Sequence, residues 1–308
     1  MGRSASLWVL ALLVLVGTPA RAEDKADPAA DYKTFLEALP KDDPASITKA
    51  IDQYRTAIVP LGTDQHAKAF LEFLEFHENV CEGVGKTFWN KPDDTAIYND
   101  VSDNERVREL HRYGLRIRGD GCDGYYVAGI PEYIPRMFAP YLPISVRRYL
   151  EVREPETRVS YQVDAVLLIP HAQVAQRVAD WDRYLKNYPD SPMRTEALVL
   201  RAQYLLDLLT GMANSPLDPA TEDRAKNIRV ICKDYMRANP GTYAGKLVWQ
   251  QYGYLKKKGF FSRPFDPYDR TACDRYDEIR KTLSKDVNLD EYWMNPESGY
   301  RAEKIKQK

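Results

Sequence analysis

The chain has few of the residue types and motifs on which an enzyme or a metal site is usually built. Its 308 residues include only four histidines and four cysteines. It contains no G-x-S-x-G elbow, no phosphate-binding loop and no G-x-G-x-x-G after a strand-like segment. Four scattered histidines give a catalytic triad nothing to anchor it. Catalysis is therefore unsupported by the sequence, and we expect neither a cofactor nor a metal.

The chain also lacks an excess of charge of either sign. Its 44 Lys and Arg residues nearly balance its 45 Asp and Glu residues. That balance provides no electrostatic footprint for nucleic acid or for an acidic membrane. After the first residues, no apolar run approaches the roughly 18 residues of a membrane-spanning helix. We therefore expect no nucleic-acid partner and no membrane span.

The first 22 residues have the three regions of an export signal. Arg3 supplies positive charge, Leu7 to Val16 are apolar, and Ala20-Arg21-Ala22 fits the small-x-small cleavage rule. The apolar run reaches about 15 Å as a helix, half of a bilayer core. We expect a cleaved signal and a periplasmic or secreted protein. The alternative is an uncleaved anchor at the membrane interface.

An even number of cysteines in an exported chain favours disulfide bridges. Pairing of neighbours gives two loops that each span 41 residues, one in each half of the chain. Because loop-closure entropy rises with loop length, we predict the bridges Cys81–Cys122 and Cys232–Cys273. If the signal interpretation is wrong, four reduced cysteines are the alternative.

Most of the chain has the periodicity and punctuation of helices. Two proline-containing turns stand out, YLKNYPDS from Tyr184 and YMRANPGT from Tyr235. Pro189 and Pro240 cannot continue a helix and disfavour α geometry in the preceding residue. We predict that Asp190 and Ser191 cap the next helix, and that Gly241 and Thr242 play the same part in the second turn. Each turn then closes an antiparallel helical hairpin.

Two segments lack helical periodicity. The run from Leu115 to Val127 places a glycine-dense hexapeptide between two β-prone stretches, which predicts a β-hairpin or an ordered loop tied by Cys122. The run from Gly83 to Asp100 predicts a surface loop. Binding and catalytic residues often lie on such loops.

The phrase W-x-x-Y-L-x-x-Y-P-D-S-P-x-x-x-E-A, from Trp181 to Ala197, resembles the unit of tetratricopeptide-like helical-hairpin repeat proteins of the bacterial cell envelope. The resemblance covers about Tyr125 to Leu255 and is closest to an uncharacterised exported family. It implies stacked helical hairpins, and for the uncharacterised family it implies no activity. The chain departs from regular repeats, because its two turns are 51 residues apart and not 34.

The predicted fold is mostly α, a stack of antiparallel helical hairpins with one small β-hairpin or ordered loop near Cys122. We divide the chain into the signal peptide 1–22, an N-terminal helical region 23–114, a disulfide-tied connector 115–130, a helical-hairpin array 131–258, and a C-terminal helix with a polar tail 259–308.

Three motifs suggest chemistry that their context does not support. His77 and Cys81 share a helical face as two zinc ligands would. A structural zinc site needs two more ligands, for which Cys122 and His111 are the candidates, and the four residues lack the spacing of a zinc motif. The run GDGCDG at Gly119 fails the register of an EF-hand calcium loop. ESGYRA at Glu297 resembles the first motif of lytic transglycosylases, yet too little chain follows to enclose a sugar.

Two functions remain open. The first is a non-catalytic binding or scaffold protein of the envelope, whose hairpins hold a protein or peptide. The second is an envelope-acting enzyme or accessory factor with a site near the Gly119–Tyr126 loop. An enzyme requires buried acid, base or nucleophile side chains that converge in a cleft, and a scaffold does not. The candidate binding residues are Asp120, Asp123, Tyr125, Tyr126 and Tyr133.

Overall fold

The computed structural model describes residues 27–88, 104–119, 125–159, 161–163, 165–212, 215–217, 222–262, 271–285 and 287. The predicted signal peptide, the loop residues Asp120, Cys122 and Asp123, and the ESGYRA motif lie outside the described residues. No helix in the described ranges is both long enough and apolar enough to cross a membrane.

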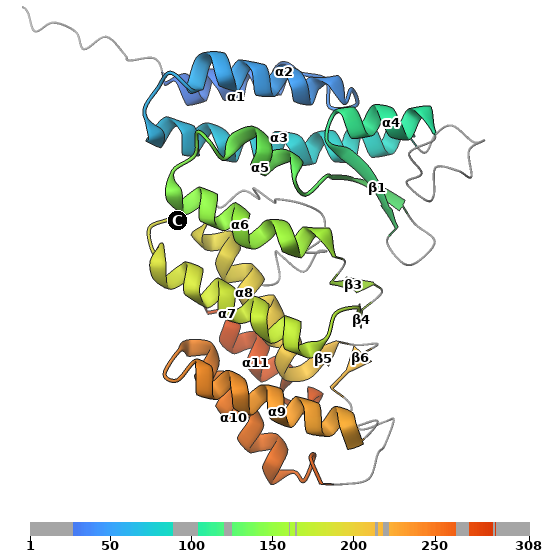
Figure 1. Ribbon diagram of the computed structural model, residues 1–308, viewed down its shortest axis with the longest axis vertical. Helices are drawn as coiled ribbons and strands as arrows, with labels where there is room; N and C mark the ends of the chain where they lie inside the picture. The colour runs from blue at the N-terminus through green and yellow to red at the C-terminus, as the bar shows by residue number, and fades with distance from the viewer. Residues whose placement is uncertain are drawn as a thin grey trace, which may run out of the picture.

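The helices are stacked in layers along the long axis of the molecule (Figure 1). The N-terminal layers contain α1 (Pro28–Ala38), α2 (Ala45–Gln53) with the π-helical turn Tyr54–Ile58, α3 (Thr63–Phe88), α4 (Glu105–Arg112) and α5 (Tyr133–Phe138). Below them follow α6 (Ile144–Arg158), α7 (His171–Asn187), α8 (Arg194–Thr210), α9 (Glu222–Ala238), α10 (Tyr243–Lys257), the 3-10 turn Cys273–Arg275 and α11 (Tyr276–Leu283). The prediction of a mostly α fold is confirmed.

The strands in the described part of the chain form three small antiparallel hairpins. The predicted β-hairpin is β1 (Leu115–Gly119) paired with β2 (Tyr125–Gly129), with Leu115 opposite Gly129. Two shorter hairpins join β3 (Gln162–Val163) to β4 (Val166–Leu167), and β5 (Gly211–Met212) to β6 (Ser215–Pro216). All three lie along the same side of the helical stack in Figure 1.

Both proline turns close helical hairpins, as the sequence predicts. Helix α7 ends two residues before Pro189 and packs along α8, and α9 ends two residues before Pro240 and packs along α10. In the second turn, Gly241 adopts a positive φ of 80°, and the Thr242 hydroxyl caps α10 by accepting from the Gly245 amide at 2.9 Å. Glycine tolerates the left-handed conformation that such a turn requires.

The first turn differs from the prediction in its cap. The α8 N-cap position is Met193, and its side chain makes no capping bond. The Ser191 hydroxyl instead accepts from the Met193 amide at 3.1 Å and lies 2.6 Å from the Tyr184 hydroxyl. Asp190 is exposed. Ser191 thus fastens the turn to α7, and Asp190 takes no part in the cap.

The prediction of a surface loop from Gly83 to Asp100 is wrong over its first part, because α3 continues to Phe88. The two glycines in this stretch suppressed the helical pattern in the sequence. Gly83 is required by packing, since a Cβ there would lie 2.4 Å from the Lys41 carbonyl oxygen. The missing side chain lets the α1–α2 connection lie directly on α3.

Helix α8 is the central helix of the lower stack. It packs against α7, α10 and α11, and nearly every residue from Ala197 to Thr210 is buried. Helix α11 also contacts α8, so the C-terminal helix packs against the helical hairpins. Aromatic rings connect the layers: Tyr149 of α6 lies 5.5 Å from Trp181 of α7 between ring centroids. Edge-to-face and tilted ring pairs of this kind add to the stability that burial provides.

Candidate functional site

A groove with a volume of about 730 Å³ runs between α6 and α7. Its α7 wall extends from Gln173 to Tyr188, about 22 Å of helix. Its α6 wall contains Arg148, Glu151, Val152, Pro155, Glu156 and Val159. The walls therefore combine apolar surface with side chains that can donate or accept hydrogen bonds. Val159 is 54% exposed although it is apolar.

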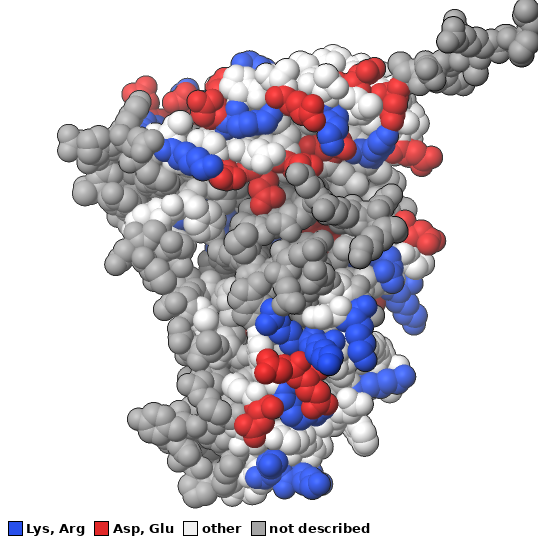
Figure 2. All heavy atoms as spheres, turned by 180° about the vertical axis from the view of Figure 1, so that it is seen from behind, with Lys and Arg blue, Asp and Glu red and all other residues white. Residues whose placement is uncertain are grey.

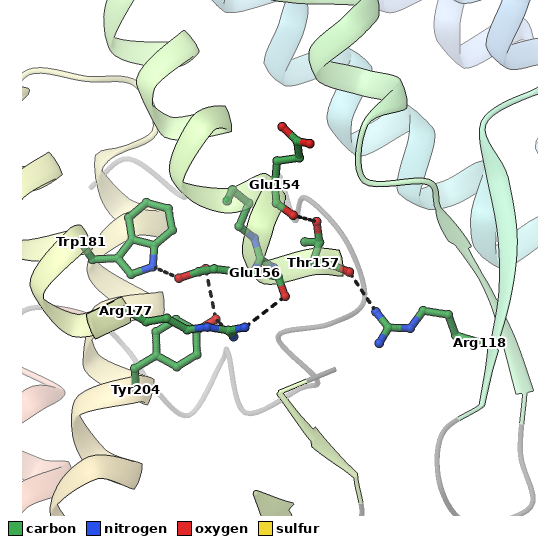
Figure 3. Close-up of polar contacts among 8 residues, drawn as sticks. Arg118, Glu154, Glu156, Thr157, Arg177, Trp181 and Tyr204 are labelled. Atoms are coloured by element: carbon green, nitrogen blue, oxygen red, sulfur yellow. Dashed lines mark hydrogen bonds and ion pairs between the residues drawn. The ribbon is translucent and has the colours of Figure 1, made fainter. Parts of the chain in front are cut away.

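Pro155 lies inside α6 and shapes the groove wall. A proline in a helix interior has no N–H to donate to the carbonyl four residues earlier, here that of Glu151. Its ring also crowds that carbonyl, so the helix ladder is interrupted in the last turn of α6. The next residue, Glu156, is buried and turns toward α7 and α8 (Figure 3).

The Glu156 carboxylate joins three helices. Trp181 of α7 donates its indole N–H to Oε1 at 2.9 Å, and Tyr204 of α8 donates its hydroxyl to Oε2 at 3.1 Å (Figure 3). The guanidinium of Arg153, one turn earlier on α6, lies 3.4 Å from Oε2. A buried polar group is tolerated when its bonds are satisfied, and a satisfied network fixes the arrangement of its helices.

Arg177 of α7 lies where this network meets the groove. It donates to the Tyr204 hydroxyl at 3.1 Å and to the Glu156 backbone carbonyl at 3.4 Å. Its guanidinium also lies over the rings of Tyr161 and Tyr204, at 5.7 and 5.2 Å from their centroids. These contacts hold Arg177 against the network of Glu156, Trp181 and Tyr204, which we call the floor of the groove. The groove therefore has a preformed shape.

Burial dominates the electrostatics of the floor. Desolvation raises the pKa of Glu156 to about 7, although Arg153 and Arg177 attract the charged form and Tyr204 and Trp181 donate hydrogen bonds to it. The pKa of Glu196 on α8 is also raised to about 7 by burial, against the opposing attraction of Arg153. Two carboxyl groups near one buried arginine therefore titrate near neutral pH.

The β1–β2 hairpin is fastened to the end of α6. Arg116 and Arg118, which point to the same face of β1, donate to the Thr157 carbonyl at 2.8 and 3.4 Å (the Arg118 bond is drawn in Figure 3). The last carbonyls of a helix lack helical partners and carry partial negative charge. The two arginines satisfy that end and connect the N-terminal layers to the groove.

Charge on the groove walls is mixed. Three arginines, Arg148, Arg177 and Arg183, and three acids, Glu151, Glu156 and Asp180, line the groove. Asp180 accepts from both Gln176 and Arg183 at 2.9 Å. The opposite face of the molecule likewise shows basic and acidic side chains interspersed (Figure 2). Neither surface favours a ligand of one charge.

The structure describes three of the five binding residues predicted from the sequence, Tyr125, Tyr126 and Tyr133, and none of them is exposed. Tyr133 is buried, and its ring lies directly under Gly114, where a Cβ would come within 2.2 Å of it. Tyr125 is partly buried against the core, and Tyr126 is also partly buried. Asp120 and Asp123 lie outside the described residues. Tyr125 and Tyr133 contribute to core packing, and binding at this loop stays a prediction.

The cysteine predictions concern two disulfide bridges. Cys81 and Cys232 are buried thiols, and the Cys273 thiol donates to the Thr210 carbonyl at 3.5 Å. Because Cys81 and Cys232 are thiols, neither the expected bridge Cys81–Cys122 nor the expected bridge Cys232–Cys273 is formed in this structure. Among the described residues, no three His, Cys, Asp or Glu side chains are grouped as metal ligands.

Sequence reasoning missed the groove floor, although a signal was present. Val146, Tyr149 and Leu150 begin an apolar stripe on α6, and Arg153 continues it at the position where an apolar residue is expected. A charged residue on the buried stripe of a helix indicates a buried polar partner. That partner, Glu156, follows one turn later.

Comparison of the chain with family models, with curated proteins and with solved structures found no match.

Proposed function

We propose that the protein is an exported, non-catalytic binding protein of the cell envelope that holds an extended segment of a partner protein in the α6–α7 groove. The groove itself is the observation that carries this proposal. Its wall of about 22 Å matches roughly seven residues of extended chain. The tetratricopeptide-like turn at Pro189 and the export signal of the sequence agree with this function.

The lining suits a peptide. Amide side chains such as Gln173 and Asn187 can bond to a peptide backbone, and Val152 and Val159 can contact its side chains. The mixed charges of the walls can select charged positions in the bound segment. Preorganisation of the floor by Glu156 lowers the entropic cost of binding.

The same network supports binding over catalysis at this site. Glu156 lines the groove and has a raised pKa, but both of its oxygens accept hydrogen bonds from neighbouring side chains. A general acid or base needs reach to a substrate proton, about 2.6–3.2 Å. An oxygen already enclosed by Trp181 and Tyr204 serves the architecture of the groove.

The proposal is tested by selecting seven-residue peptides from a displayed library on the mature protein. Affinity of the selected peptides is then measured for two variants with matched exposed valines. Val159→Glu changes the groove, whereas Val230→Glu changes a 52% exposed valine on α9. We expect at least a tenfold loss of affinity for Val159→Glu and no change for Val230→Glu. Equal effects of the two substitutions, or no selected peptide, would refute the groove as the binding site.

A further inference from the structure

A second cavity, of about 610 Å³, is lined by Gln203, Leu206 and Asp207 of α8 and shares no lining residue with the α6–α7 groove. This volume is within the range of about 300–1,000 Å³ that small-molecule sites occupy. Side chains from α8, from β5 and from the Cys273–Leu283 segment line it. Those that carry the argument are Leu206, Asp207, Met212, Tyr276 and Asp277.

Asp207 is the unusual group in this cavity. It is only 8% exposed, and the hydroxyl of the buried Tyr161 donates to its Oδ2. Within the described part of the chain, no residue donates a hydrogen bond to Oδ1. Burial raises the pKa of Asp207 well above its ordinary value, so the charged carboxylate is favoured only when a cation lies beside it. The carboxyl group therefore presents one unused acceptor oxygen to the space that it lines.

Tyr161 holds this carboxyl group in place. Its ring packs edge-to-face against Tyr204, with centroids 4.9 Å apart, and Arg177 lies over it from the groove side. Its hydroxyl has a fixed position, so Asp207 cannot rotate freely to satisfy Oδ1 elsewhere. A fixed, partly satisfied carboxyl in a cavity indicates a missing hydrogen-bond donor.

The residues that line the cavity indicate which chemical group would donate a hydrogen bond to Oδ1 of Asp207. Two carboxyl groups, Asp207 and Asp277, line the cavity, and no Lys or Arg is among its described lining residues. An anion would be repelled there. A metal ion is disfavoured, because the described residues offer no group of three metal-binding side chains. An ammonium group would donate to Oδ1 in a charge-assisted hydrogen bond, which is stronger than a neutral one.

The rest of the lining fits the carbon part of such a ligand. The ring of Tyr276 can face a cation, and Leu206 and Met212 offer apolar surface. We propose that this cavity binds a small organic amine in its ammonium form, with Asp207 as its counter-ion. This site is separate from the α6–α7 groove and does not depend on the function proposed for it.

The test is an NMR titration of the mature protein at pH 7.5 with n-butylamine and, as uncharged isostere, 1-butanol. We expect n-butylamine to bind at least tenfold more tightly than 1-butanol, and Asp207→Asn to lower its affinity at least tenfold. Asparagine keeps an acceptor for Tyr161 but loses the charge. The control Asp234→Asn, an exposed acid on α9, should leave the affinity unchanged. Equal binding of the two ligands, or an equal effect of the two substitutions, would overturn the proposal.

A second measurement needs no variant that alters Asp207. With methyl-labelled methionine, the wild-type protein should show a nuclear Overhauser effect between the n-butylamine chain and the Met212 methyl group, because Met212 lines the cavity. Met212→Trp should fill the space and abolish binding without a change of charge. An Overhauser effect only to other methionines, or unchanged binding to Met212→Trp, would contradict the assignment.

Discussion

The hydrogen bonds of Glu156 hold the three helices of the groove together. The burial of this carboxyl group can be measured through its effect on the pH dependence of stability. Its pKa lies near 4.5 in the unfolded chain and is raised to about 7 in the folded protein. The folded state therefore binds more protons between these pH values, and the free energy of unfolding falls as pH rises through them. The difference corresponds to about 3 kcal/mol at most.

Glu156→Gln removes this dependence. We expect the variant to gain about 3 kcal/mol at most in unfolding free energy relative to wild type between pH 4.5 and 8, measured by urea denaturation. Gln176→Ala, a groove substitution without a titrating group, should follow the wild-type profile. Parallel profiles of Glu156→Gln and wild type would show that the carboxyl is not held in the state described.

The titration of His77 changes the stability of the fold with pH in the opposite direction. It is buried beside Gly129 and Phe73, its Nε2 makes no hydrogen bond to any described residue, and desolvation lowers its pKa from 6.5 to about 4. The unfolded chain binds more protons between these values, so acidification destabilises the fold there. We expect His77→Phe to gain stability relative to wild type as pH falls from 6.5 to 4, by about 3 kcal/mol at most.

Urea denaturation at several pH values measures this effect as well. The control Phe76→Leu, a buried neighbour on α3, should lower stability by a similar amount at every pH. A constant offset between His77→Phe and wild type across the range would mean that the imidazole titrates normally in the fold.

At the scale of helices, two glycines make a matched pair. Gly83 in α3 faces the Lys41 backbone, whereas Gly253 in α10 is exposed, and no described atom lies within 4 Å of the position that an alanine methyl group would take there. We expect Gly83→Ala to destabilise the fold by about 1–3 kcal/mol through overpacking. Gly253→Ala should stabilise it by about 0.5–1 kcal/mol, because alanine favours the helix. Thermal unfolding measures both, and equal signs would contradict the described α3 packing.

The helical hairpins could be predicted because their causes are local. Pro189 and Pro240 end helices by their own covalent chemistry, and Thr242 caps α10 through its own hydroxyl. Gly83 misled the prediction because a glycine is needed there for close packing against Lys41, which is 42 residues away in the chain. Local signals identify where helices begin and end, but not what lies against them.

The groove could not be predicted, because it depends on contacts between residues that are far apart in the chain. Its floor requires Glu156, Trp181 and Tyr204 to meet from three helices, and nothing in their spacing fixes that meeting. The tyrosine-rich connector was the more visible feature of the sequence. Tyr133, which follows the connector, shows the ambiguity of such a signal, because a tyrosine can equally fill a core, and here it does.

At the scale of the whole molecule, cysteine mapping tests how the chain is held together. From the structure we expect Cys232 and Cys273 to react with iodoacetamide when the protein is unfolded without a reductant. Mass spectrometry of the digested protein measures this. A Cys232–Cys273 linked peptide would restore the pairing that loop length favours and contradict the thiols described.

The central claim is that the face between α6 and α7 receives the partner. The most direct measurement uses a library-selected peptide that carries a photoreactive group, crosslinked to the mature protein and mapped by mass spectrometry. The account predicts adducts on α6 from Arg148 to Val159 and on α7 from Gln173 to Tyr188. Adducts concentrated instead on α10 around Trp249, the most exposed large apolar side chain of the described residues at 69%, would contradict it.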